Sequence, residues 1–352
     1  MNIFKKTVLI LIILITIYTL YLLYLQRMQI KLSMKEGFDN DESKKEYESV
    51  KKDEFPSIGP FLPKNYDVNI ELKQFCIKAS YNSAYTGDKY VSLDMISHVI
   101  QRGCRFLDFE IYAFDGEPFV AFSEDKENIQ TNKLPLMDVL ARIDEHAFVP
   151  ESGNFVTPNP NDPMFLHFRI RTDYKESFYT KMNNYVTNTL SSKIYSGSVS
   201  EITPIRTLMN KYIVIYDTKS SNNYFKGNEL LTKNLESNGI KLKSWYENNL
   251  LDTGTNPPLI VESQDNKIRT NVEKYQMVVP NNGRGFSFIY YYDNVEPYSV
   301  YENYGIQIVC MKFYINDNLK KYEQIFGDLG SAIVPLSYVI ENIQNKNDNF
   351  FI

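Results

Sequence analysis

Apolar and polar residues alternate along the chain in two patterns that together predict an α/β structure. Short apolar runs, typical of buried strands, occur at 75–79, 105–113, 119–122, 164–171, 211–216, 259–262, 276–279 and 306–313. Positions 93–101, 136–146 and 173–190 repeat apolar residues at the spacing of amphipathic helices. Strands that alternate with helices in this way predict a (β/α)8, TIM-type barrel.

The N-terminal residues carry a different pattern, a long uncharged run at 7–25. At ~1.5 Å per residue this run is long enough to cross a hydrocarbon core of about 30 Å as one helix. A cleaved signal peptide is the alternative, although the run exceeds the usual apolar core of such a peptide. We therefore expect residues 1–30 to anchor a single-pass membrane protein. Basic residues on both sides of the run leave its orientation open.

The composition changes after the anchor and divides the rest of the chain. Residues 31–60 are dominated by charged and polar residues, which predicts a flexible tether. The barrel is expected over 61–340, and 341–352 reads as a polar tail. With 43% hydrophobic residues among 352, the chain can form one core of barrel size.

Charge and cysteine usage narrow the partners and the compartment. A formal net charge of -5 gives no basic field, so nucleic acid is not expected as a partner. The cysteines Cys76, Cys104 and Cys310 lie in or beside predicted strands and form no disulfide framework. The sequence contains no Asn-x-Ser/Thr glycosylation site. Both features favour a barrel on the cytosolic side of the membrane or inside a particle.

Four segments carry motifs that extend over both halves of the predicted barrel. Residues 80–87 read Ser-Tyr-Asn-Ser-Ala-Tyr-Thr-Gly, and 102–110 read Arg-Gly-Cys-Arg-Phe-Leu-Asp-Phe-Glu. Residues 115–118 read Asp-Gly-Glu-Pro, and 303–313 read Asn-Tyr-Gly-Ile-Gln-Ile-Val-Cys-Met-Lys-Phe. These segments resemble the X and Y regions of eukaryotic-type phosphoinositide-specific phospholipase C. The resemblance implies an X-like half at 72–190, a linker at 191–256 and a Y-like half at 257–337.

The resemblance also implies a chemistry, in which two histidines act as acid and base on a phosphodiester and calcium stabilises developing charge. Asp108 and Glu110 fall on one face of a strand by period two, and with Asn82 they align with calcium ligands of the family. The family's remaining carboxylate ligand corresponds to Arg169. A guanidinium there can neutralise two buried carboxylates, so we expect it to replace the metal and no cofactor to be required. The alternatives are residual calcium binding and a metal-free catalytic or phosphate-binding role for Arg169.

The positions of both family histidines carry other residues, Tyr81 and Phe122. A phenol with an ordinary pKa of about 10 is a poor proton shuttle, and phenylalanine transfers no proton. His167 shares the inward face with Arg169 and is the one candidate substitute. Arg284 and Ser287 resemble the family's Arg-x-x-Ser and are candidates for contacting an anionic ligand, with ordinary surface-loop roles as the alternative.

These observations favour a membrane-anchored phospholipase C-like protein that lacks acid/base catalysis and acts in binding or structure. Its ligand would be a phospholipid or another phosphodiester, and a protein partner is a further expectation. One alternative is an active phosphoric diester hydrolase of lipid metabolism with altered acid/base residues. Another is a structural virion or membrane protein, since the bias toward Asn, Lys, Ile and Tyr is typical of an AT-rich genome such as that of a large DNA virus.

Overall fold

A computed structural model describes most of the predicted barrel region and part of the segment before it. The described residues are 18, 21, 41–50, 55–61, 70–123, 129, 131–171, 176–197, 199, 202–216, 241–244, 276–279, 294 and 296–349. The chain divides into two units, 1–44 and 45–352. Among the described residues, no helix is both long and apolar enough to span a membrane. The predicted anchor at 7–25 lies, apart from residues 18 and 21, outside the described part of the chain.

Seven parallel strands form the centre of the second unit. Their order across the sheet is β9-β10-β11-β1-β2-β7-β8. The bounds are β1 Phe75–Ser80, β2 Phe106–Phe114, β7 Met164–Ile170, β8 Tyr212–Tyr216, β9 Lys241–Ser244, β10 Gln276–Val279 and β11 Ile308–Met311. Every residue of β1, β7, β8 and β11 is buried, as expected of parallel strands covered on both faces.

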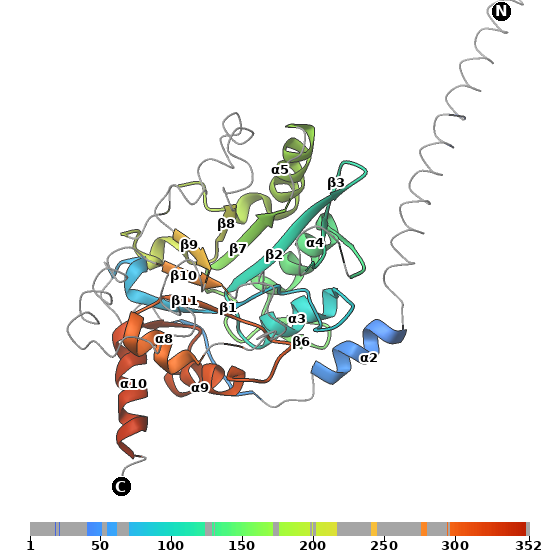
Figure 1. Ribbon diagram of the computed structural model, residues 1–352. Helices are drawn as coiled ribbons and strands as arrows, with labels where there is room; N and C mark the ends of the chain where they lie inside the picture. Colours follow the sequence, from blue (N-terminus) through green and yellow to red (C-terminus); the bar gives the residue numbers. More distant parts are fainter. Residues whose placement is uncertain are drawn as a thin grey trace, which may run out of the picture. The chain divides into compact units, whose positions relative to one another are not determined.

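Helices lie around these strands, as Figure 1 shows. They are α3 Leu93–Gln101, α4 Leu136–Ala147, α5 Glu176–Leu190, α8 Pro297–Tyr304, α9 Leu319–Leu329 and α10 Leu336–Asn349. The helix α3 begins at an N-cap, Ser92, whose side chain accepts a hydrogen bond from the Asp94 amide. Shorter strands are β3 Glu117–Val120, β4 Leu134–Pro135, β5 Glu151–Ser152, β6 Phe155–Val156 and β12 Ile333–Pro335. The 3-10 turns are Leu72–Gln74, Ser191–Lys193 and Ile205–Leu208.

The strands separate two apolar clusters, as their period of two requires. On β2, Leu107, Phe109 and Ile111 belong to the larger cluster, which includes the packed faces of the helices. Phe106 belongs to a second cluster on the opposite face of the strands. Asp108 and Glu110 share that opposite face by alternation and are both buried. The predicted period of this strand is therefore correct.

One predicted strand has a different role in the sheet. The run at 119–122 was expected to be a parallel barrel strand, but β3 pairs antiparallel with β2. The connection is a two-residue turn at Asp115 and Gly116, whose φ values are 51° and 77°. Asp-Gly is a preferred pair for such hairpin turns because both positions require a positive φ. The predicted strand at 259–262 lies outside the described residues.

The expected tether at 31–60 contains a helix, α2, spanning Asp41–Val50. Its Tyr47 is buried and meets the ring of His98 edge-on, with ring centroids 6.0 Å apart. Further along, Ile58 packs so closely that a Cβ on Gly103 would lie 1.9 Å from its Cδ1. The charged composition of this segment predicted a flexible tether. Its described part is instead ordered, because Tyr47 and Ile58 are buried against α3 and the turn that follows it.

The C-terminal residues also differ from the prediction of a polar tail at 341–352. The helix α10 continues to Asn349, and Ile343 within it is fully buried. The polar residues of this segment belong to the outer face of an amphipathic helix. The three cysteines are unpaired and buried, and burial raises the pKa of Cys104 to about 12. Their predicted lack of a disulfide is confirmed.

Candidate functional site

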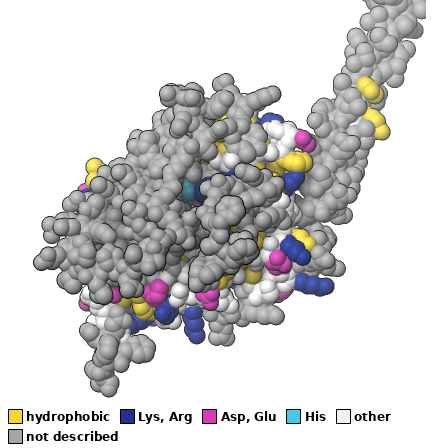
Figure 2. Space-filling view, viewed as in Figure 1, with side chains coloured by type: hydrophobic (Ala, Val, Ile, Leu, Met, Phe, Trp, Pro, Cys, Tyr) yellow, Lys and Arg dark blue, Asp and Glu magenta, His cyan; other side chains and the backbone are white. Residues whose placement is uncertain are grey.

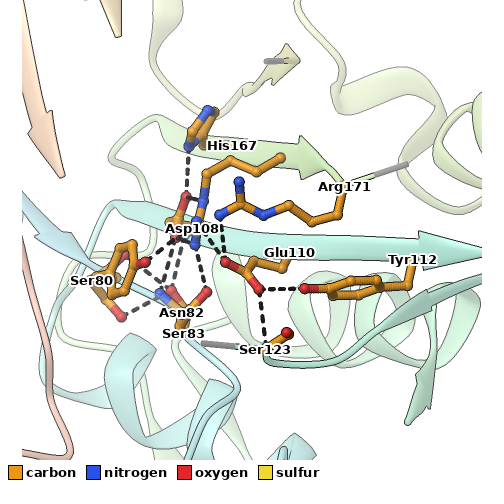
Figure 3. A network of polar contacts seen from close by, with 11 residues as sticks. Ser80, Asn82, Ser83, Asp108, Glu110, Tyr112, Ser123, His167 and Arg171 are labelled. Carbon is orange, nitrogen blue, oxygen red and sulfur yellow. Dashed lines mark hydrogen bonds and ion pairs between the residues drawn. The ribbon is translucent and has the colours of Figure 1, made fainter. Parts of the chain in front are cut away.

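The inward-facing residues of β2 and β7 meet in register and form one buried polar cluster, drawn in Figure 3. Asp108 pairs with His167, and Glu110 pairs with Arg169. None of these four residues is more than 5% exposed. The parallel register therefore brings together the two carboxylates, the predicted substitute histidine and the predicted arginine.

The guanidinium of Arg169 lies between the two carboxylates. Its Nε and Nη2 donate to the two oxygens of Asp108 at 2.8 and 2.6 Å, which is a bidentate pair. Its Nη1 donates to Glu110 Oε1 at 2.8 Å, and its Nη2 also donates to Asn82 Oδ1 at 2.6 Å. The guanidinium carbon lies 4.6 Å from the centroid of the Tyr81 ring, and Nη1 is 3.4 Å from its hydroxyl oxygen.

Further donors complete the hydrogen bonding of Glu110. Arg171 Nη2 donates to Oε1 at 2.5 Å, and the Tyr112 hydroxyl donates to Oε2 at 2.9 Å. The Ser123 amide lies 3.4 Å from the same Oε2. Arg171 and Tyr112 were not among the predicted site residues. Both could have been found, because each follows the inward positions of its strand by two residues.

Asp108 and Glu110 are ionised at neutral pH. Burial by itself would raise the pKa of Asp108, but the charge of Arg169 and the bond from His167 hold that pKa well below its ordinary range. For Glu110, burial is likewise opposed, first by Arg171 and then by Arg169, and the net pKa is lowered. Burial raises the pKa of Tyr81 well above that of an ordinary tyrosine. The residue in the first histidine position therefore stays protonated.

The loop after β1 carries Asn82 into the cluster. Asn82 has a φ of 44°, a left-handed conformation that asparagine tolerates better than most residues. The backbone amide of Asn82 donates to Asp108 Oδ2 at 3.0 Å. The loop is also fixed to β2 through Ser83, whose amide donates to the Asp108 carbonyl at 2.8 Å. Gly87 has a φ of 119°, and a Cβ there would lie 3.2 Å from Tyr314 Cβ.

The second histidine position, Phe122, packs into an aromatic contact. Its ring stacks on that of Tyr85 with centroids 4.0 Å apart. A gap of about 160 Å³ of empty space, lined by Asn82, Glu110 and Phe122 among others, lies beside this stack. The gap is too narrow to hold a water molecule. The Phe122 side chain has no group that could donate a proton to the carboxylates or accept one from them.

His167 has one ring nitrogen committed to the cluster. Nδ1 lies 2.7 Å from Asp108 Oδ1, and because an ionised carboxylate only accepts, Nδ1 carries the proton. Nε2 is buried and has no hydrogen-bond partner within the described part of the chain. The imidazole lies 5.9 Å from the ring of Phe106. Figure 2 shows histidine atoms next to Lys or Arg atoms near the centre of the face it draws.

Two predicted ligand contacts, Arg284 and Ser287, lie outside the described residues.

The three predicted calcium ligands are described, and they do not fit calcium. Ca²⁺ takes six to eight oxygen ligands around one centre. Here oxygens of Asn82, Asp108 and Glu110 all accept from the Arg169 guanidinium, whose positive charge stands where the cation would. Within the described ranges, no group of three or more His, Cys, Asp or Glu residues could hold a metal ion.

Comparisons with known proteins agree with the fold. Residues 68–218 match the family model described as phosphatidylinositol-specific phospholipase C, X domain. The chain is similar in structure to PLC21 of L. pealei, with a TM-score of 0.57 and 16% identity over 77% of this chain and 38% of that one. PLC21 of S. officinalis gives a TM-score of 0.56 and 15% identity over 78% of this chain and 38% of that one. The chain thus spans well under half the length of either PLC21.

A bacterial structure is more distantly similar. It is the calcium-dependent phosphoinositol-specific phospholipase C of a Pseudomonas species, with a TM-score of 0.46 and 10% identity over 80% of this chain and 100% of that one. No curated protein matches the chain significantly. The family match covers the strands that hold Asp108, Glu110, His167 and Arg169, and the parallel sheet agrees with it. Residues 68–218 therefore form a domain of the phosphatidylinositol-specific phospholipase C X-domain family.

Proposed function

We propose that this protein binds an anionic phospholipid headgroup or a related phosphodiester without hydrolysing it. The observation that carries the proposal is the complete use of Arg169. A guanidinium has five N–H donors, and Arg169 directs one at Tyr81, one at Asn82, one at Glu110 and two at Asp108. None remains to stabilise charge on a reacting phosphate, which supports a structural role for this arginine.

Among the described residues, the two carboxylates of the cluster do not form a usable acid/base pair, which supports the same proposal. Each carboxylate is held ionised by arginine and accepts several hydrogen bonds, so neither is poised to take a proton near neutral pH. Tyr81 and Phe122 occupy the positions where the family resemblance implies the two histidines, and neither transfers protons near neutrality.

One donor and one acceptor on the same face of the β7 region remain for a ligand, because the proton of His167 is on Nδ1 and its Nε2 therefore accepts. Arg171 Nε and His167 Nε2 are buried and have no hydrogen-bond partner in the described part of the chain. They lie on either side of Arg169 in the sequence, at the spacing of one strand face. A phosphodiester oxygen that accepts from Arg171 Nε would satisfy the buried donor, and a headgroup hydroxyl that donates to His167 Nε2 would satisfy the buried acceptor.

The architecture and location are part of the proposal. The strand order, with β8 and β9 at its two ends, is that expected of a (β/α)8 barrel opened between them and supports a TIM-type architecture. The uncharged run at 7–25 supports single-pass membrane attachment. Unpaired cysteines and the lack of glycosylation sites support a barrel on the cytosolic side or inside a particle.

The test measures binding and turnover on the full chain in detergent micelles or lipid nanodiscs. We expect no hydrolysis of phosphatidylinositol or of a chromogenic phosphodiester, with or without calcium. We expect binding to vesicles that contain phosphatidylinositol, weakened at least about tenfold in Arg171→Gln by loss of a charge-assisted contact. Arg206→Gln, at an exposed arginine, is the matched control. Turnover that Asp108→Ala abolishes would contradict the proposal.

A second candidate function rests on the contact between His167 and Asp108. A carboxylate that orients Nδ1 and leaves Nε2 available is the arrangement of a histidine acting as a general base. An active hydrolase of this kind predicts that His167→Gln lowers turnover roughly 100-fold or more. His98→Gln changes a buried histidine on α3, outside this cluster, and should leave that turnover unchanged.

A further inference from the structure

A second place in the molecule binds a negative charge through backbone amides. The loop at 86–89 directs two adjacent amides at one carboxylate, that of Glu46 on α2. Asp88 N lies 3.1 Å from Oε1, and Lys89 N lies 3.2 Å from both Oε1 and Oε2. The Thr86 hydroxyl also contacts Oε1. Successive amides that converge in this way form a concave anion site, often called a nest.

The loop keeps this shape through bonds that do not involve Glu46. The Thr86 amide donates to the Tyr90 carbonyl at 3.0 Å, and the Tyr85 hydroxyl donates to the Asp88 carbonyl at 2.9 Å. Thr86 Oγ1 is also 2.7 Å from Tyr90 O, so its single proton is shared between that carbonyl and Glu46. The Asp88 and Lys89 amides are therefore the constant donors of a preformed site.

Glu46, the residue that occupies this anion site, belongs to a short helix. The helix α2 spans Asp41–Val50, and most of its described side chains are exposed or half-buried, Glu46 among the latter. Tyr47 is the one described residue of α2 that is buried. A ten-residue, mostly charged helix is marginal without tertiary contacts. An anion of higher charge can compete with Glu46, because a phosphate offers three acceptor oxygens and up to two negative charges.

The same loop reaches the buried cluster at its other end. Asn82 accepts from Arg169, and Tyr85 stacks on Phe122. The stretch from 82 to 89 thus joins the Arg169 cluster to the Glu46 site in eight consecutive residues.

We propose that residues 86–89 form a binding site for a phosphate monoester group and that Glu46 fills this site in the ligand-free protein. The group comes from free phosphate or from a phosphorylated lipid headgroup. Its binding displaces the Glu46 carboxylate and undocks α2 from the loop. This site is separate from the one formed by Arg171 and His167, so its test does not depend on the proposed function.

Amide hydrogen exchange on the full chain in nanodiscs measures the two donors directly. In Glu46→Ala, we expect the amides of Asp88 and Lys89 to exchange at least about tenfold faster, because a charge-assisted acceptor is lost. Inorganic phosphate should restore their protection in this variant. Glu48→Ala changes an exposed acid two residues away on the same helix and should leave the exchange unchanged.

Two further arms separate the ligand sources and guard against misfolding. Nanodiscs that contain phosphatidylinositol 4-phosphate offer the monoester on a lipid, whereas phosphatidylinositol offers only a diester. Protection restored by the phosphorylated lipid alone assigns the site to a headgroup, and protection restored by inorganic phosphate as well assigns it to the phosphate group itself. In the double variant of Glu46→Ala with Thr86→Val, phosphate should protect these amides less than in Glu46→Ala, because the hydroxyl donor is lost. Unchanged exchange in Glu46→Ala, or no protection by either ligand, would overturn the proposal.

Discussion

Replacing Arg169 by methionine tests whether this guanidinium neutralises the cluster. The change removes the charge and all five donors but keeps a long apolar side chain. Glu110 would retain Arg171, the Tyr112 hydroxyl and the Ser123 amide. Asp108 would lose both hydrogen bonds from Arg169. It would keep the hydrogen bonds from the Asn82 backbone amide and from His167 Nδ1. The cost therefore falls mainly on Asp108.

The magnitude follows from leaving a buried charge without its partner. Breaking a buried ion pair by removing one member costs about 3–5 kcal/mol. Because Asp108 is fully buried, we expect Arg169→Met to lower the free energy of unfolding by about 4 kcal/mol at pH 7.5. Arg169→Lys keeps the charge but not the planar fork, so its loss should be smaller. Arg206→Met, at an exposed arginine, should change the free energy by less than about 0.5 kcal/mol.

The pH dependence of the deficit identifies its cause. In the wild type, the pKa of folded Asp108 is lowered, so its contribution is present above the unfolded pKa near 3.9 and is lost as the pH falls through the folded value. In Arg169→Met, burial dominates and raises the folded pKa above 3.9. The variant then gains stability on acidification, by up to about 1.4 kcal/mol per pH unit between the two pKa values.

Urea unfolding at pH 7.5 and pH 5 measures both quantities on the same protein. The deficit of Arg169→Met should be smaller at pH 5, and the double variant with Asp108→Asn should recover most of the loss because no buried charge remains. A deficit of less than about 1 kcal/mol at pH 7.5 would refute the reasoning. So would a deficit that stays constant between the two pH values.

Three other perturbations test the metal site, a second buried ion cluster and a titrating carboxyl. Millimolar calcium should raise the urea midpoint of Arg169→Met but not that of the wild type, because only this variant frees the oxygens of Asp108 and Glu110. Equal shifts in the two proteins would show that the wild-type site already binds calcium. Glu323→Gln should lower the free energy of urea unfolding by about 3–5 kcal/mol, because the buried Lys78 and Arg102 lose their shared carboxylate. The same change at the exposed Glu341 should lower it by less than about 0.5 kcal/mol. Burial raises the pKa of Asp162 to about 6, above its unfolded value, so the wild type should gain roughly 2–3 kcal/mol as the pH falls from 6 to 4. Asp162→Asn should lack that gain, and a full gain in this variant would assign it to another group.

The sequence predicted six of the seven parallel strands, because buried strands carry their pattern locally, and missed β9, Lys241–Ser244, which lies in the predicted linker at 191–256. The helix at 93–101 and the strand at 276–279 match the structure at both ends. Contacts between segments that are distant in sequence were missed. Glu46 meets its amides 42 and 43 residues further along, and no local pattern marks that pairing. The hairpin at Asp115 could have been predicted from its turn residues, whereas the docking of α2 could not.

The inward face of β7 shows how far sequence reasoning reaches into the site. Period two placed His167 and Arg169 together, and extension by two residues would have added Arg171. Which of these groups is left for a ligand depends on hydrogen-bond geometry, which the sequence does not contain. Arg169 was a candidate phosphate contact because of its position in the family resemblance. The five contacts of its guanidinium instead leave Arg171 Nε as the donor, and His167 Nε2 as the acceptor, without a partner among the described residues.

A guanidinium in place of a cation changes what the stability of the fold depends on. The stabilisation that a bound ion gives the folded state grows with the logarithm of its free concentration relative to its dissociation constant, whereas Arg169 is always present. The same contacts that hold Asp108 and Glu110 ionised leave none of the arginine's donors for a substrate. The proposed function therefore assigns stability without calcium and the lack of electrophilic assistance to the same five contacts. Calcium chelation should leave the urea unfolding of the wild type unchanged.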